Sequence, residues 1–179
     1  HPRVVAGVPP DYFSETGQRW GNPLYKWDVQ EADGFQFWIN RLKVQSMLFD
    51  FLRIDHFRGF EAYWEIPAEE ETAINGHWVK APGERMFGKL YEALPHLELV
   101  AEDLGIITPE VDAMRKAHSL PGMKILQFAF SGGSDNPYLP YHHTRDSVVY
   151  TGTHDNDTTL GWYTSLSDGE REAVDDYLG

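Results

Sequence analysis

Four segments of the chain carry helical signals. Phe35, Trp38, Ile39 and Leu42 recur at the three- and four-residue spacing of a helix, so they would form one apolar stripe. A second helix is predicted from the apolar residues Phe87, Leu90, Tyr91 and Leu94, and it ends at Pro95. A third starts at Thr108-Pro109-Glu110 and runs toward Pro121. The last starts with a capping box formed by Ser167 and Glu170.

Four shorter apolar runs predict β-strands over residues 49–55, 97–102, 123–130 and 147–153. In the first run, side-chain alternation places Arg53 and Asp55 on one face and Leu52 and Ile54 on the other. Between these elements, residues 57–83 and 131–146 are predicted to be loops. Residues 1–32 are rich in glycine and proline, and predict a long loop that its aromatic side chains would order.

The predicted order alternates helices and strands, which is typical of parallel strands joined by helical crossovers. Because a closed eight-stranded barrel typically needs about 250 residues, we expect residues 1–179 to be about half of a (β/α)8 TIM barrel. Residues 33–179 would supply four β/α units, and 1–32 a substrate-binding loop. A complete small open sheet is the alternative. Unsealed edges of such a sheet could pair with a second copy.

Charge and composition exclude several classes of partner and of site. The chain has 28 aspartates and glutamates but 15 lysines and arginines, which gives a formal net charge of −13. A charge this negative argues against binding to nucleic acid or to a membrane surface. Cysteine is absent, so disulfides and thiolate metal sites are excluded, which fits a reducing cytoplasm. We expect neither a transmembrane segment nor a signal peptide. The first residue is His1, so we also expect a processed or excised segment.

Acidic residues stand where three of the predicted strands end: Asp55, Glu102 and Asp155. The carboxyl ends of parallel strands meet at one rim, where catalytic sites are built. Carboxylates on one rim repel each other, so at least one should have a raised pKa and keep its proton near neutrality. A protonated acid beside an ionised one is what cleavage of a glycosidic bond requires.

Structural explanations compete with this chemistry. A single aspartate after a strand is often the N-cap of the next helix, which would account for Asp55 or Asp103. Against that, an inward Arg53–Asp55 pair would be buried, and a buried charge pair needs a site to explain it. His142-His143 lacks the spacing of a metal site. Residues 155–159 resemble the aspartyl-phosphate loop of Mg²⁺-dependent haloacid-dehalogenase-type phosphatases, which leaves a phosphatase as an alternative.

Several blocks together resemble the amylomaltases, the 4-α-glucanotransferases of glycoside hydrolase family 77. The blocks, in order, are GVPPDYFS (7–14), TGQRWGNP (16–23), RIDHFRG (53–59), AEDLG (101–105) and TGTHDNDT (151–158). The resemblance implies transfer of α-1,4-glucan segments between maltooligosaccharides with no metal or organic cofactor. Because the family's enzymes are longer, the isolated chain would be an internal fragment with little or no activity.

The resemblance also implies roles for individual residues. Asp55 would be the nucleophile, Glu102 the general acid and then base, and Asp155 the residue that holds sugar hydroxyls and stabilises the transition state. Substrate-binding roles would fall to Arg53, which also orients Asp55, and to His154, Asp11, Tyr12, Phe13, Trp20 and His56. The aromatic loop would shield the site from water, so that a sugar acts as acceptor. A non-catalytic glucan-binding module built on this loop is a further alternative.

Overall fold

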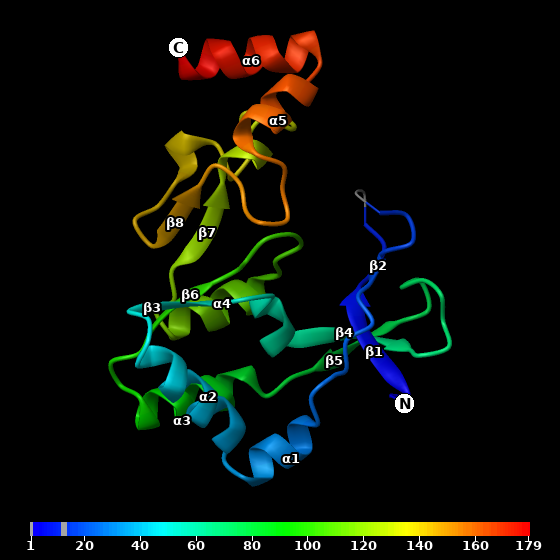
Figure 1. Cartoon of the computed structure of the whole chain (residues 1–179), viewed down its shortest axis with the longest axis vertical. Coiled ribbons are helices and arrows are strands. Elements are labelled where there is room, and N and C mark those ends of the chain that lie inside the picture. The colour runs from blue at the N-terminus through cyan, green and yellow to red at the C-terminus, as the bar shows by residue number, and fades with distance from the viewer. Residues whose placement is uncertain (1, 12–13) are drawn as a thin grey trace. The chain divides into compact units, whose positions relative to one another are not determined.

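The computed structural model describes residues 2–11 and 14–179, and the chain divides into two compact units, His1–Leu120 and Pro121–Gly179 (Figure 1). In the described part of the chain, no helix is long and apolar enough to cross a membrane.

The first unit contains an antiparallel sheet in segments that were predicted to be loops. Its strands lie in the order β2-β1-β4-β5, and their bounds are Gln18–Arg19, Val4–Val8, Ala62–Pro67 and His77–Lys80. The loop predictions for 1–32 and 57–83 were therefore wrong. A small core of Val5, Ile66 and Ala73 joins residues distant in sequence, and a local pattern does not show such a core.

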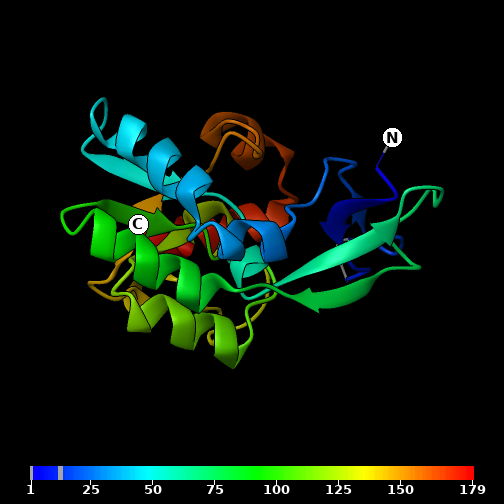
Figure 2. The same cartoon turned by 90° about the horizontal axis from the view of Figure 1, so that it is seen from below.

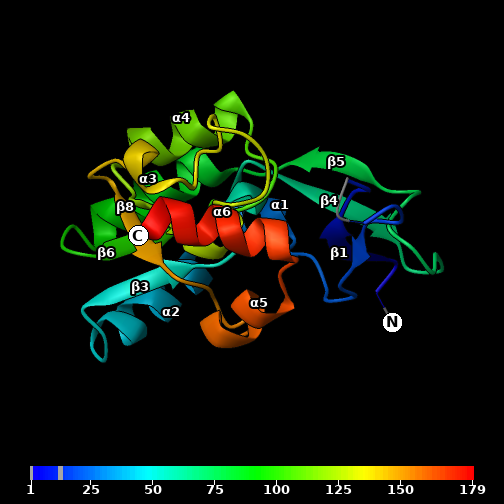
Figure 3. The same ribbon diagram turned by 90° about the horizontal axis from the view of Figure 1, so that it is seen from above.

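Gly7 shows why this sheet packs closely. A Cβ at Gly7 would lie 2.2 Å from the carbonyl oxygen of Gln18 on the neighbouring strand. Only glycine fits this close approach of two backbones. Figures 2 and 3 show the antiparallel sheet to one side of the helices of the same unit. The helix α1 (Trp27–Ala32) follows β2 in sequence and was also not predicted.

The rest of the first unit is an α/β arrangement around one core. The strands β3 (Phe51–Ile54) and β6 (Glu98–Ala101) pair in parallel. The helices are α2 (Gln36–Ser46), α3 (Gly83–Ala93) and α4 (Pro109–Ala117), and the 3-10 helix η1 (Phe57–Phe60) follows β3. All three helices were predicted, although α4 ends at Ala117, before the proline at 121.

The apolar stripes of these helices form the core. In α2, Trp38 and Leu42 are buried, as their spacing predicts. In α3, Phe87 and Leu90 have no exposed surface. At the start of α4, Thr108 is the N-cap and Pro109 the first helical residue. The Thr108 side chain accepts no capping hydrogen bond from a backbone N–H, and its hydrogen bond is with the Glu110 carboxylate. The helix start is thus correct, although the predicted capping contact is absent from this turn.

The second unit is also built on a parallel pair of strands, β7 (Gly122–Ile125) and β8 (Ser147–Tyr150). The strand predicted over 123–130 ends at Ile125, and the 3-10 helix η2 (Leu126–Phe128) follows it directly. A further 3-10 helix is η3 (Pro140–His142), and the last two helices are α5 (Thr159–Ser165) and α6 (Asp168–Leu178). None of the residues of α5 is buried, so the helix has no apolar stripe, and it was not predicted.

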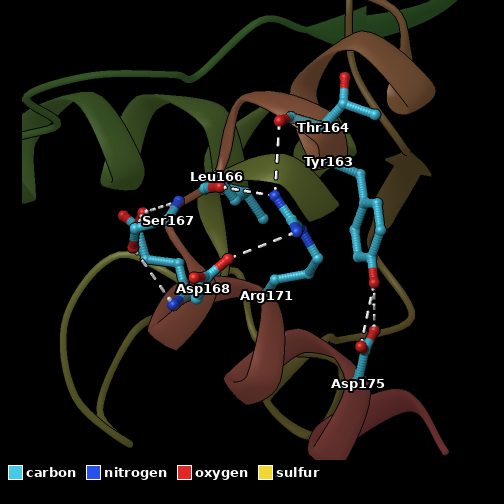
Figure 4. Close-up of polar contacts among 8 residues, drawn as sticks. Tyr163, Thr164, Leu166, Ser167, Asp168, Arg171 and Asp175 are labelled. Atoms are coloured by element: carbon cyan, nitrogen blue, oxygen red, sulfur yellow. Dashed lines mark hydrogen bonds and ion pairs between the residues drawn. The ribbon is translucent and has the colours of Figure 1, made fainter.

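The start of α6 confirms the predicted capping box. The Glu170 backbone N–H donates to the Ser167 hydroxyl, and the Ser167 N–H donates to the Glu170 carboxylate at 2.9 Å. Figure 4 shows that the Arg171 guanidinium points at the segment between α5 and α6, where it donates to the carbonyl of Leu166 at 2.9 Å. Cap and guanidinium together fix the connection between the two helices.

The fold class is α/β, as predicted, but its sheets are mixed. All four predicted strands exist, and they pair in parallel within their units as β3–β6 and β7–β8. The antiparallel sheet β2-β1-β4-β5 is the correction, because the chain was expected to hold only parallel strands.

Candidate active site

Two of the three predicted acids leave neighbouring strands at the same end. In the parallel register of β3 and β6, Ile54 is paired with Ala101. Asp55 and Glu102 are the next residues on the two strands, so both follow the carboxyl edge of this sheet. In parallel α/β folds, this is the edge where ligands bind.

Glu102 is held by four hydrogen bonds of the backbone. Its own N–H donates to the Ile54 carbonyl at 2.9 Å, and its carbonyl accepts from the Phe57 N–H at 3.0 Å. The side chain is held as well: Oε2 accepts from the His56 N–H at 2.7 Å, and Oε1 accepts from the Leu104 N–H at 2.8 Å. Both carboxyl oxygens are thus fixed by rigid donors, not by flexible side chains.

The environment of Glu102 raises its pKa above the ordinary value. Burial is the largest cause, and the neighbouring Asp55 charge adds to it. The N–H groups of Leu104 and His56 act in the opposite direction, and so does Arg53. The raised pKa was predicted from repulsion between carboxylates, but burial contributes more than repulsion does. A larger fraction of Glu102 therefore keeps its proton near neutrality than in an ordinary glutamate.

Asp55 forms an ion pair with Arg53, its second neighbour on β3. The guanidinium Nη2 lies 2.6 Å from Asp55 Oδ1, which agrees with their predicted position on one face. The pair is not buried, however: the Asp55 side chain is 72% exposed and that of Arg53 is 31% exposed. The expectation of burial was wrong, because side-chain alternation predicts which residues share a face of a strand but not whether another element covers that face.

Neither aspartate in this region acts as a helix cap. His56 occupies the N-cap position of η1, and Thr108 that of α4. Asp103, directly after Glu102, instead lies 3.4 Å from Nε of Arg115, a buried arginine of α4 that also donates to the Leu120 carbonyl at 2.7 Å. The N-cap explanation of Asp55 and Asp103 is therefore wrong.

His56 and Trp20 join this group. His56 lies in the left-handed region of the backbone, with φ 47°, and the Trp20 ring, which follows β2, meets the His56 ring edge-on at 4.7 Å between centroids. Burial lowers the pKa of His56 to about 4, with Arg58 acting in the same direction and Asp55 against it. His56 is therefore uncharged at neutral pH.

Asp11, Tyr12 and Phe13 are the other site residues predicted in the aromatic loop. Tyr12 and Phe13 lie outside the described residues. Asp11 takes part in a turn, where its Oδ1 accepts from the Ser14 N–H at 2.9 Å. Of the loop, Trp20 is the residue that the structure brings beside His56.

Arg58 is a contributor that the sequence patterns did not single out. It is buried, and its guanidinium carbon lies 3.9 Å from the centroid of the Trp78 ring. Its Nη1 donates to the Ile106 carbonyl at 3.4 Å, in the segment that follows Glu102. The sequence signal that could have indicated its role is its place in the RIDHFRG block (53–59), where it is the second arginine. Arg58 ties the turn after β3 to β5 and to the segment after β6.

The third predicted acid lies in the second unit, in the segment after β8. Asp155 Oδ2 is 3.4 Å from Nε2 of His154, and the two side chains are 75% and 69% exposed. The turn that carries them is held locally: Asn156 Oδ1 accepts from the N–H of Thr153 at 2.8 Å and from its hydroxyl at 2.9 Å. Thr153, Asn156 and Asp157 also line a polar pocket of about 210 Å³. That Asp155 shares a site with Asp55 and Glu102 stays a prediction.

The phosphatase alternative would use Asp155 and Asp157 to bind Mg²⁺. Among residues 2–11 and 14–179, no three His, Asp or Glu side chains are grouped so that they could hold a metal ion. The Asp157 carboxylate instead accepts from the Thr158 N–H at 2.7 Å, directly before α5.

Comparison with known proteins identifies the family to which these residues belong. The family model for glycoside hydrolase family 77, described as 4-alpha-glucanotransferase, matches residues 2–179. The chain is 62% identical over 179 residues to a 4-alpha-glucanotransferase of Thermus thermophilus, and 54% identical over 178 residues to one of Synechocystis sp.. These alignments cover 99% and 98% of the chain but 36% and 35% of the relatives. The chain thus spans about a third of their length.

Solved structures give the same picture. The fold is similar to that of an amylomaltase from Streptococcus agalactiae in complex with acarbose, with a TM-score of 0.93 and 39% sequence identity. That alignment covers 99% of the chain and 36% of the solved chain. A similar fold also occurs in an amylomaltase from Corynebacterium glutamicum, with a TM-score of 0.80 at 22% identity.

Proposed function

The chain belongs to glycoside hydrolase family 77, the 4-alpha-glucanotransferases, and on that premise we propose that it is a segment of the catalytic (β/α)8 barrel of such a transferase, about half of the barrel. The whole protein transfers α-1,4-glucan segments between maltooligosaccharides. The observation that carries this proposal is the arrangement of Glu102. Its side chain is half-buried, both of its carboxyl oxygens accept backbone hydrogen bonds, and its pKa is raised beside the exposed Asp55–Arg53 pair.

In the first step, Glu102 protonates the oxygen of the glycosidic bond while Asp55 attacks the anomeric carbon. The bond from carbon to the leaving sugar breaks, and a covalent bond from Asp55 to the glucan forms. Retaining enzymes need their two carboxyl groups about 5–5.5 Å apart, which suits acids on adjacent parallel strands. Arg53 orients the nucleophile through the ion pair at 2.6 Å. In the whole protein, Asp155 and His154 hold hydroxyls of the same sugar and stabilise the transition state.

In the second step, Glu102 acts as the base. It removes the proton from a hydroxyl of an acceptor sugar, whose oxygen attacks the anomeric carbon and releases Asp55. Transfer needs the acceptor to compete with water. Trp20, which is 44% exposed beside His56, supplies an aromatic surface for that acceptor. If Trp20→Ala leaves the ratio of transfer to hydrolysis unchanged, this role of Trp20 is wrong.

The substrates, the location and the assembly of the whole protein belong to the same proposal. A glucan substrate is supported by the solved amylomaltase with bound acarbose. The proposal includes no cofactor, a cytoplasmic location and no membrane or nucleic-acid partner. The isolated chain can self-associate through the open edges of its strands. The family match over residues 2–179 favours the transferase over the phosphatase and over a non-catalytic glucan-binding module.

Incubation with maltotriose tests the proposal. We expect the whole protein to produce glucose together with maltopentaose and longer oligosaccharides, which reports disproportionation. Glucose and maltose alone would indicate hydrolysis and contradict the transferase assignment. The 179-residue chain, assayed at the same concentration, should show little or no turnover. Turnover equal to that of the whole protein would show that the other two thirds of the family's length are not needed.

A further inference from the structure

The structure assigns His56 a role that differs from substrate binding. We propose that His56 is a positioning residue for Glu102, and that its ring, confined between Trp20 and Gly59, fixes the backbone turn whose N–H groups hold the acid. The inference rests on the proposed function, in which Glu102 is the general acid and base. In this proposal, the His56 ring connects Trp20 of the aromatic loop to Glu102, the proton donor.

The first step of the argument is the backbone of His56. Its φ of 47° and ψ of 52° lie in the left-handed region, which residues with a side chain rarely adopt. This conformation directs two successive N–H groups at one residue: that of His56 to Glu102 Oε2 at 2.7 Å, and that of Phe57 to the Glu102 carbonyl at 3.0 Å. Relaxation of the turn toward an ordinary conformation would remove these donors from the acid.

The second step is the confinement of the ring. On one side, the Trp20 ring meets it edge-on, with an interplanar angle of 86°. At Gly59, a Cβ would lie 2.8 Å from Cδ2 and 3.4 Å from Nε2 of the same imidazole. The Gly59 N–H also donates to the His56 carbonyl at 2.9 Å, which closes the turn. The ring can keep its place only while residue 59 has no side chain.

The third step is that the ring acts by position and not by charge. His56 has a pKa of about 4, so it is neutral where a general acid works at neutral pH. The charged groups that act on it are Arg58 and Asp55, and those that act on Glu102 are Asp55 and Arg53. None of these is Trp20 or Gly59. A change at either of these two residues adds or removes no charge. It can reach Glu102 through the geometry of the turn or through burial, and because lost burial would lower the pKa of Glu102, a rise in that pKa reports the turn.

This geometry predicts the direction of the effect. The His56 N–H is one of the two backbone donors that lower the pKa of Glu102 against the effect of burial. If the turn loosens, this donor is weakened while the partial burial of Glu102 is unchanged. The pKa of Glu102 then rises further, and the pH at which the acid loses its proton moves upward.

A titration of the Glu102 carboxyl in the 179-residue chain tests the inference without any transfer activity. The chain is labelled with ¹³C at glutamate side chains, and the Glu102 signal is identified by its loss in Glu102→Gln. In Gly59→Ala, we expect the Glu102 midpoint to move up by about 0.5–1 pH unit, the size of shift that loss of one charge-assisted hydrogen bond produces. Trp20→Ala should move it in the same direction by less, and Trp20→Phe should restore it.

Gly88→Ala is the matched control, because a Cβ at this position of α3 meets nothing within 4 Å. Its Glu102 midpoint should equal that of the parent chain. An unchanged Glu102 midpoint in both Gly59→Ala and Trp20→Ala would overturn the inference, and so would an equal shift in Gly88→Ala. Trp20 is 44% exposed, so Trp20→Ala remains informative even if Gly59→Ala does not fold. If the chain shows the shift but the whole protein fails to disproportionate maltotriose, the proposed function fails and the positioning of Glu102 by His56 stands.

Discussion

The two strand ends that carry the predicted acids are built in opposite ways. After β3 and β6, Glu102 is half-buried, and backbone N–H groups of the turns of the fold donate to both of its carboxyl oxygens. After β8, Asp155 is 75% exposed and stands on a turn held by its own neighbours, Thr153 and Asn156. One acid depends on packing between elements distant in sequence, and the other on a local turn.

The difference matches the chemistry proposed for each residue. A general acid needs a shifted pKa, which burial supplies to Glu102. A group that grips sugar hydroxyls needs access to the ligand, and the exposed Asp155 has that access in its unit. Substitutions at the ends of β3 and β6 should therefore change both the protonation of Glu102 and the rate of catalysis. Substitutions in the turn after β8 should have a smaller effect that is confined to that turn.

The largest effect is expected from Asp55→Asn. Without the nucleophile the covalent intermediate does not form, so transfer from maltotriose by the whole protein should fall by about 10³-fold or more. Asp50→Asn, an exposed aspartate just before the same strand, is the matched control and should retain activity. Substantial transfer by Asp55→Asn would mean that the ion pair with Arg53 is structural and that the nucleophile lies elsewhere.

The next effect is expected from Glu102→Gln. Loss of the acid should lower the transfer rate by about 10²–10⁴-fold, the usual contribution of general acid–base catalysis. The pH profile gives a sharper test. Because the pKa of Glu102 is raised, the protonated form persists to higher pH than in an ordinary glutamate, so activity of the parent should fall on the basic side as pH rises through that pKa. Glu102→Gln should lose this basic limb, and a variant that retains it would show that another group titrates.

The strand ends could be found from the sequence because their signals are local. The alternation over 49–55 placed Arg53 and Asp55 on one face, and the structure confirms their ion pair. The position of Glu102 after an apolar run, together with the rule that the carboxyl ends of parallel strands meet, placed it on the same rim as Asp55, and the structure pairs their two strands. These inferences need only side-chain alternation and the order of the elements.

The parts that were missed depend on partners distant in sequence. β4 pairs with β1, more than fifty residues earlier, so residues 57–83 were taken for a loop. The two N–H groups that donate to the Glu102 carboxyl oxygens are placed by the left-handed turn at His56 and by the path of the chain to Leu104. No pattern of side chains in the sequence indicates either of these backbone features. The exposure of Asp55 was missed for the same reason, since an alternation pattern does not tell whether another layer of the structure covers a face.

A smaller effect is expected from Asn156→Ala in the turn after β8. It removes the acceptor for the N–H and hydroxyl of Thr153, so the turn should lose about 1–2 kcal/mol of stability. If Asp155 depends on this turn, transfer by the whole protein should fall by about tenfold, with an unchanged pH profile. A shift in the pH at which activity falls on the basic side would contradict the proposal that the turn after β8 acts only locally. Asn136→Ala, in the loop before η3, is the control variant for transfer activity.

The smallest effect is expected from Ser167→Ala at the start of α6. Loss of the cap should lower the free energy of unfolding of the second unit by about 1 kcal/mol, measured by urea denaturation. Ser165→Ala, whose hydroxyl only donates to the Trp162 carbonyl of its own helix, should cost less. Neither change should alter transfer activity, and a loss of activity in Ser167→Ala would extend the functional region beyond the two strand ends.

A trapped intermediate tests the central claim, that Asp55 and Glu102 act on one bond as nucleophile and acid/base. The whole protein with Glu102→Gln is incubated with α-maltosyl fluoride, whose fluoride leaves without help from an acid, while the missing base slows release of the glycosyl group. We predict that mass spectrometry of the peptides finds an added maltosyl group on Asp55. A maltosyl group on another carboxylate, or no accumulation in Glu102→Gln while fluoride is released, would contradict the account.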